Sequence, residues 1–302
     1  MAVRGRRRAG AEVTLEDVRP DTYRPSERRI ERERFRRART RRAVIIGAVS
    51  TLATAGLLIG LVVSSPGWQR TRETFFNAHD ARASLPKILD GLWLNLQLMV
   101  VCGAVVLVLG LLLAVTRTLR GPVFFPLRAL ATAYVDFFRG LPLIICLLGV
   151  VFGVPALRLQ GVTTDPVVLG GTALVLTYSA YVAEVFRAGI DTVHPSQRAA
   201  ARSLGLSSAQ TMRHVVLPQA VRRVVPPLLN DLVSLQKDTG LVSIAGAVDA
   251  VYAAQIYAGK TFNYTSYVVA GLIFVALTIP MTRFTDWITA RMNRRQSQGG
   301  TV

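Results

Sequence analysis

Four ionisable residues interrupt the apolar runs of this chain, where a charge is costly unless it binds a solute or is paired. They are Glu184, Asp231, Lys237 and Asp238. Asp231 and Asp238 are seven residues apart and share a helix face, whereas Glu184 is spaced to pair with Arg187. A set of mixed sign suits a zwitterionic solute, which needs partners for both of its charges. The alternative is that these residues pair with one another or cap a helix broken at Thr239-Gly240.

No constellation for enzymatic catalysis accompanies these charges. The three histidines, His79, His194 and His214, lie outside the apolar runs, and no nucleophile–base pair is evident. The phosphate-loop candidate at 259–261 lacks the first glycine of that pattern, because Ala254 stands in its place. We therefore predict no enzyme activity and no nucleotide, metal or other cofactor site in this chain.

A polar, alanine-rich segment between two apolar runs carries a different signal. Residues 197–204 favour a helix, and Gly205 stands where a helix can end in a left-handed residue without steric cost. Ser207 or Ser208 can cap a second helix, and Pro218 fits the first turn of a third. This pattern predicts a helical hairpin that lies against a partner's groove. An amphipathic hairpin resting on lipid is the alternative.

The elements that hold these residues are apolar runs about as long as a bilayer is thick, roughly 20 residues each. The chain has 302 residues, 51% of them hydrophobic, and a formal net charge of +18. Six crossings are predicted, the third broken by Gly and Pro: 43–64, 92–115, 122–157, 167–186, 224–251 and 267–288. The predicted fold class is an all-α integral membrane protein with about six transmembrane helices.

Arginine is concentrated in alternate connections between these runs, which predicts that both chain ends lie in the cytoplasm. Residues 1–42 read as a basic, largely disordered tail that contacts anionic lipid. The tail has no helix-turn-helix pattern or zinc-ligand spacing, so no nucleic-acid partner is predicted. After it we expect, in order, an N-terminal helix 43–64, an extracytoplasmic segment 65–90, a transmembrane domain 91–288 with a cytoplasmic loop 188–223, and a cytoplasmic tail 289–302.

The cytoplasmic loop resembles the EAA loop of permease subunits of ATP-binding-cassette (ABC) importers. That signature reads Glu-Ala-Ala, three residues, Gly, nine residues, Ile, one residue, Leu-Pro. The matching positions are Ala199, Ala200, Ala201, Gly205, Val215, Leu217 and Pro218. The flanks at 139–142, 181–190 and 237–243 are similar to the polar amino acid branch of that family. The likeness covers about residues 91–288, so the first span lies outside the family's five-helix core.

The resemblance implies the permease subunit of an ATP-driven importer for a polar or charged amino acid, either glutamate- or glutamine-like or basic. It implies a dimer of ABC ATPase subunits that bind ATP and Mg, a second permease subunit, identical or related, and an extracytoplasmic binding protein that delivers the amino acid. It places the ATPase contact at Gln197, Arg198, Ala199, Ala200, Ala201, Gly205, Leu206, Leu217 and Pro218. Ala199 stands where the family has Glu, so docking is expected to rest mainly on shape. The expected location is the plasma membrane.

Two other classes of function require features that the sequence lacks. A membrane-anchored regulator with a basic tail needs a folded nucleic-acid-reading domain in residues 1–42. A secondary amino acid transporter or a channel needs inverted repeats or a pore motif, and it has no use for a cytoplasmic coupling hairpin.

Overall fold

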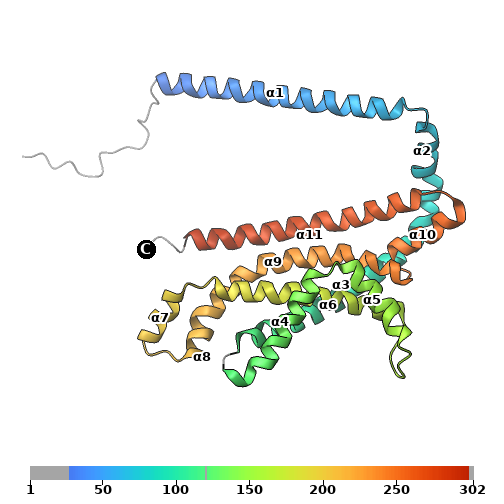
Figure 1. Ribbon diagram of the computed structural model, residues 1–302. Helices are drawn as coiled ribbons and strands as arrows, with labels where there is room; N and C mark the ends of the chain where they lie inside the picture. Colours follow the sequence, from blue (N-terminus) through green and yellow to red (C-terminus); the bar gives the residue numbers. More distant parts are fainter. Residues whose placement is uncertain (1–26, 120, 299–302) are drawn as a thin grey trace, which may run out of the picture. The chain divides into compact units, whose positions relative to one another are not determined.

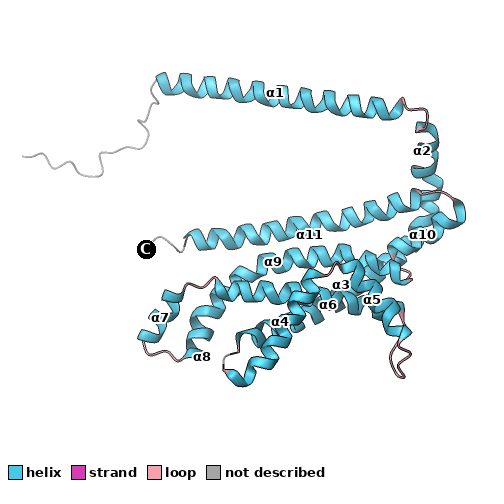
Figure 2. Cartoon of the chain, in the orientation of Figure 1, coloured by secondary structure: helices cyan, strands magenta, loops and turns pink. Residues whose placement is uncertain are grey.

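The computed structural model describes residues 27–119 and 121–298, and these residues fold into helices and short connections without a strand (Figure 2). Most of the predicted basic tail lies outside this range. The chain divides into two units, Met1–Trp68 and Gln69–Val302. The described part of the first unit is essentially one helix, α1 (Glu27–Val63). Its stretch Arg39–Val63 is long and apolar enough to cross a membrane, and none of its most apolar window is buried.

The second unit begins with α2 (Trp68–Phe75) and α3 (Ala78–Thr118). The segment 65–90, predicted as a connection outside the membrane, is therefore mostly helical, and α3 starts well before the predicted residue 92. Its start is fixed by the Asn77 side chain, which accepts hydrogen bonds from the His79 and Asp80 amides and so satisfies two otherwise unpaired helix N–H groups. With 41 residues, α3 is about 60 Å long, twice the thickness of the hydrocarbon core.

A layer of long helices forms the core of this unit. Figure 1 shows α3, α6 (Pro166–Asp191) and α9 (Leu217–Asp238) running alongside one another, and α6 contacts both of the others. The largest apolar cluster joins these helices to α5 (Leu143–Ala156). Its fully enclosed side chains include Leu147, Leu174 and Leu235. The core therefore surrounds the middle of α6, which is the helix that carries Glu184.

The predicted break in the third span is confirmed. A 3₁₀ turn (Pro122–Phe124) leads into α4 (Phe125–Gly140), and α4 and α5 are bent by 107° about the intervening Leu141-Pro142. Proline lacks the N–H that would continue the helix of α4 and disfavours helical geometry in the residue before it. Only the bent pair of α4 and α5 together is long and apolar enough to count as one membrane crossing.

The predicted span over 224–251 is not a single helix. After α9 comes a 3₁₀ segment (Thr239–Ala245), and then α10 (Ala250–Thr261) extends past the predicted end of that span. The turn between them uses Gly246 at φ +87°, and Asp249 caps α10 by accepting the Tyr252 amide. The last helix is α11 (Thr265–Gln298). Four helices of the described chain can cross a membrane alone, and six crossings result if each bent pair is one span.

Candidate functional site

The alanine-rich segment folds as the predicted hairpin. Helix α7 (Pro195–Ser203) is followed by Gly205 at φ +85°, and Ser207 caps α8 (Ser208–Thr211) in a capping box with Gln210. A left-handed residue is what a turn this sharp needs, and Gly adopts it without a Cβ penalty. Helix α7 begins two residues earlier than predicted, because the His194 ring nitrogen accepts the Ser196 amide.

The hairpin continues into α9 without a break. Residues Met212–Val216 form a π turn in which the Leu217 amide donates to the Met212 carbonyl, one residue further back than in an α-helix. That wider turn accommodates Pro218, which has no N–H to donate, and the Gln219 side chain donates to the Val215 carbonyl at 2.9 Å. Pro218 does lie in the first turn of α9, as predicted. The expected separation of a second and a third helix is replaced by one continuous helical path.

The predicted contact residues form an open surface on this hairpin. Ala201 is buried, and Arg198 and Leu206 are half-buried. The others, Gln197, Ala199, Ala200, Gly205, Leu217 and Pro218, are exposed. Leu204, next to the turn, is 83% exposed.

Glu184 lies in an ion-pair cluster where α3, α4 and α6 meet. Its carboxylate is paired with Arg187, with Arg117 at 3.0 Å and with Arg139 at 3.7 Å, and Arg187 also binds Asp191 at 2.7 Å. The predicted pairing of Glu184 with Arg187 is thus present. Arg139 of α4 also contributes to this cluster. The charge of Glu184 is therefore compensated by protein groups from three helices.

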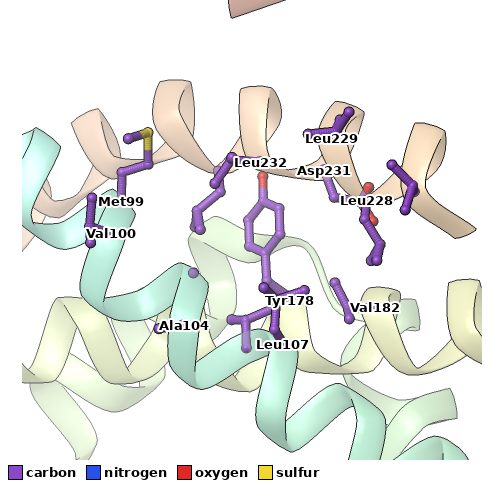
Figure 3. Close-up of a pocket in the computed structure, with 14 residues that line it drawn as sticks. Met99, Val100, Ala104, Leu107, Tyr178, Val182, Leu228, Leu229, Asp231 and Leu232 are labelled. Carbon is purple, nitrogen blue, oxygen red and sulfur yellow. The ribbon is translucent and has the colours of Figure 1, made fainter. Parts of the chain in front are cut away.

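Asp231 and Asp238 lie on the side of α9 that faces α6, in keeping with the shared face that their spacing predicts. Asp231 lines a 480 Å³ cavity between α3, α6 and α9, and its Oδ2 is buried with no hydrogen-bond partner among the described residues. Tyr178 projects from α6 toward α9 in the same cavity (Figure 3) and donates a 2.7 Å hydrogen bond to Asp238. Lys237 is exposed and does not line this cavity. The structure brings the two carboxylates to one region and leaves the lysine apart.

Sequence reasoning missed a buried polar cluster at the α9–α10 turn. Asn95 of α3 donates to Thr239 at 3.2 Å and to Asp249 at 3.0 Å, and it accepts the Ala250 amide at 3.1 Å. All of these side chains are fully enclosed. Gly91, one turn earlier, allows the approach, since a Cβ there would lie 2.3 Å from the Asp249 carbonyl carbon. The available signal was a lone asparagine in an apolar run, because an amide in hydrocarbon must find partners.

The long apolar helices, the broken spans and the polar hairpin define a multi-pass membrane transport subunit. The family model described as binding-protein-dependent transport system inner membrane component matches residues 106–295. A probable glutamine ABC transporter permease protein, GlnM, of Bacillus subtilis (strain 168) is 35% identical over 209 residues, which is 68% of this chain and 93% of that protein. The arginine transport system permease protein ArtQ of the same strain is 34% identical over 199 residues, covering 66% and 89%.

Solved structures agree with the sequence relatives. A crystal structure of an amino acid ABC transporter with histidines aligns with a TM-score of 0.64 and 31% identity over 68% of this chain and 94% of that one. The MetNI methionine ABC transporter shares the fold at a TM-score of 0.56 and 23% identity, covering 69% and 97%. The chain belongs to the family of inner membrane components of binding-protein-dependent transport systems. It is a permease subunit of an ABC importer, in which the ATPase is a separate subunit.

Proposed function

We propose that this chain carries a polar or charged amino acid into the cytoplasm, as one of two permease subunits driven by a pair of ATPase subunits. The relatives named for glutamine and arginine transport support an amino acid as the solute. An extracytoplasmic binding protein delivers it, in keeping with the family's description. The arginine bias places both termini in the cytoplasm, with residues 65–90 outside and the basic tail against anionic lipid.

The observation that carries this proposal is the hairpin formed by α7, Gly205 and α8. It presents exposed alanines and Leu204, small and apolar groups of the kind that anchor a helix in a groove. The ATPase subunit supplies that groove. Ala199 stands where the family signature has a glutamate. Shape and the remaining polar contacts therefore hold the permease and the ATPase subunit together.

The cavity between α3, α6 and α9 lies on the solute's path. Asp231 offers a buried carboxylate oxygen that has no hydrogen-bond partner in the described part of the chain, and an ammonium or guanidinium group satisfies it. The Tyr178 hydroxyl already donates a hydrogen bond to the Asp238 carboxylate. These two groups can bind a solute only if that hydrogen bond is broken. Lys237 and Glu184 contribute less directly, since Lys237 is exposed and Glu184 is held by three arginines.

Reconstitution tests the proposal. In proteoliposomes that contain this chain, its partner permease, the ATPase pair and the binding protein, amino acid uptake should require ATP. Uptake driven by an ion gradient without the ATPase would overturn the assignment. Asp231→Asn should weaken uptake of basic amino acids, whereas Asp286→Asn, a change at an exposed site on α11, should not. Equal uptake by both variants would remove Asp231 from the path.

A further inference from the structure

A second cavity, separate from the solute path, lies between the hairpin and the ends of α3 and α6. It has a volume of 820 Å³ and is lined by four arginines and one acid, Arg117, Arg187, Arg198, Arg202 and Asp191. Ala199, Ser208 and Thr211 also line it. Two of the four arginines are already neutralised, since Arg187 pairs with Glu184 and Asp191, and Arg117 pairs with Glu184.

The other two arginines have only uncharged partners in the described chain. Arg198 donates to the Ile190 carbonyl at 2.6 Å, and its Nε is buried without a partner. Arg202 donates to the Ser208 hydroxyl at 2.9 Å. Neither guanidinium has a carboxylate within 4.0 Å among the described residues. The cavity therefore holds two positive charges that nothing in this part of the chain compensates.

Thr211 contributes a buried hydroxyl group to the wall of this cavity. Its side chain is only 4% exposed, and its hydroxyl has no hydrogen-bond partner among the described residues. A buried hydroxyl left without a partner is destabilising, and because Thr211 lines the cavity, a group bound there could supply the missing acceptor. A guanidinium Nε–H, a second guanidinium and a hydroxyl form a set of donors typical of oxyanion recognition.

We propose that this cavity binds the phosphate group of a soluble phosphate monoester. A carboxylate brings one negative charge, whereas a phosphate monoester carries about −1.5 to −2 at neutral pH and matches the two uncompensated arginines. The cavity exceeds the size of a bare phosphate many times over, which leaves room for the organic part. Because α7 and α8 form one wall, a bound anion holds the hairpin against α3 and α6 and so adjusts how the ATPase meets the permease. The binding itself does not depend on the proposed transport function.

Equilibrium dialysis of the full-length chain in phosphatidylcholine nanodiscs tests this inference. The ligands are radiolabelled inorganic phosphate and glycerol phosphate, at an ionic strength held constant with chloride. One saturable site is expected. Arg202→Gln and Thr211→Val should each weaken binding roughly tenfold or more, because each removes a hydrogen bond to a charged group. Thr211→Val breaks no existing hydrogen bond, so its fold is retained.

Two further variants make the outcome sharper. Ala199→Glu places a carboxylate on the wall of the cavity, where it competes for the arginines, and phosphate binding should disappear while the thermal midpoint rises. Arg213→Gln makes the same charge change as Arg202→Gln at an exposed position outside the cavity, and binding should be unchanged. No saturable binding, or equal loss in the Arg202 and Arg213 variants, overturns the proposal. Loss of phosphate binding when phosphatidylglycerol is added to the nanodiscs also overturns it, in favour of a lipid headgroup site.

Discussion

Replacing Asn95 with Ala tests whether the enclosed polar cluster fastens α3 to the α9–α10 turn. The change leaves the Ala250 amide without its acceptor and removes a donor from the Asp249 carboxylate. The Thr239 hydroxyl keeps its 2.7 Å bond to the Gln236 carbonyl, so it adds little. The substitution therefore acts mainly on two fully enclosed groups, the Ala250 amide and the Asp249 carboxylate, each of which loses a hydrogen bond.

The expected loss follows from these two groups. An unpaired buried N–H costs about 1–3 kcal/mol, and a lost hydrogen bond to a charged group costs about 1.5–3 kcal/mol. Together they give a decrease of roughly 2.5–6 kcal/mol in the free energy of unfolding. An average interhelical side-chain hydrogen bond in a membrane protein contributes only about 0.6 kcal/mol. A decrease in the free energy of unfolding well above this average therefore shows that the enclosure of Asp249 and Ala250 makes these hydrogen bonds important.

The measurement is unfolding of the purified chain by dodecyl sulfate titration in mild detergent. Asn95→Leu keeps the number and branching of the side-chain heavy atoms without their hydrogen bonds, leaves no void, and should be destabilised like Asn95→Ala. Asn230→Ala removes the same atoms from an exposed site on α9, and its effect should stay within about 0.5 kcal/mol. The reasoning fails if Asn95→Leu restores stability, since a void then explains the loss, or if Asn95→Ala matches the Asn230 control.

Three other predictions concern the hairpin turn, the ion-pair cluster and the close approach at Gly91. Gly205→Val should uncouple ATP hydrolysis from uptake, because a β-branched residue resists φ +85° by about 1–2 kcal/mol; unchanged coupling speaks against the docking role. Glu184→Gln should lower the free energy of unfolding by on the order of 2 kcal/mol, since Arg117 and Arg139 lose their counter-charge while Arg187 keeps only Asp191. Asp191→Asn should change the free energy of unfolding by under about 1 kcal/mol, because the Asp191 side chain is 58% exposed and its ion pair with Arg187 is screened by solvent. Gly91→Ala should destabilise, as its Cβ meets backbone at 2.3 Å, whereas Gly149→Ala meets nothing within 4 Å and should be neutral or slightly stabilising; equal melting midpoints would contradict the close approach.

Local chemistry explains which features the sequence predicts. The left-handed Gly205, the Ser207 cap and the bend at Leu141-Pro142 follow from backbone preferences of single residues. The seven-residue spacing of Asp231 and Asp238 predicts a shared face, because helical periodicity is itself local. The family resemblance of the loop rests on the same local pattern.

Contacts between distant segments explain what the sequence did not predict. Nothing near Asn95 in the chain indicates that Asp249, 154 residues later, is its partner. The same holds for Tyr178, whose partner Asp238 lies on another helix, and for Arg117, which reaches Glu184 from α3. The sequence did not predict the start of α10 because Asp249 acts as a helix cap only after the left-handed Gly246 has ended the preceding 3₁₀ segment.

The continuity of α8, the π turn and α9 makes one element serve both proposed tasks. Leu217 is at the hairpin and Asp231 is in the solute cavity, about 21 Å further along the same helix at 1.5 Å per residue. Pro218, Pro226 and Pro227 lie within α9, which remains helical through all three, so one helix connects the hairpin directly to the cavity. The 3₁₀ segment and the left-handed Gly246 come only after Asp238. Asn95 fastens that turn to α3, so movement delivered by α9 is expected to act at Tyr178 and Asp231 rather than at α10.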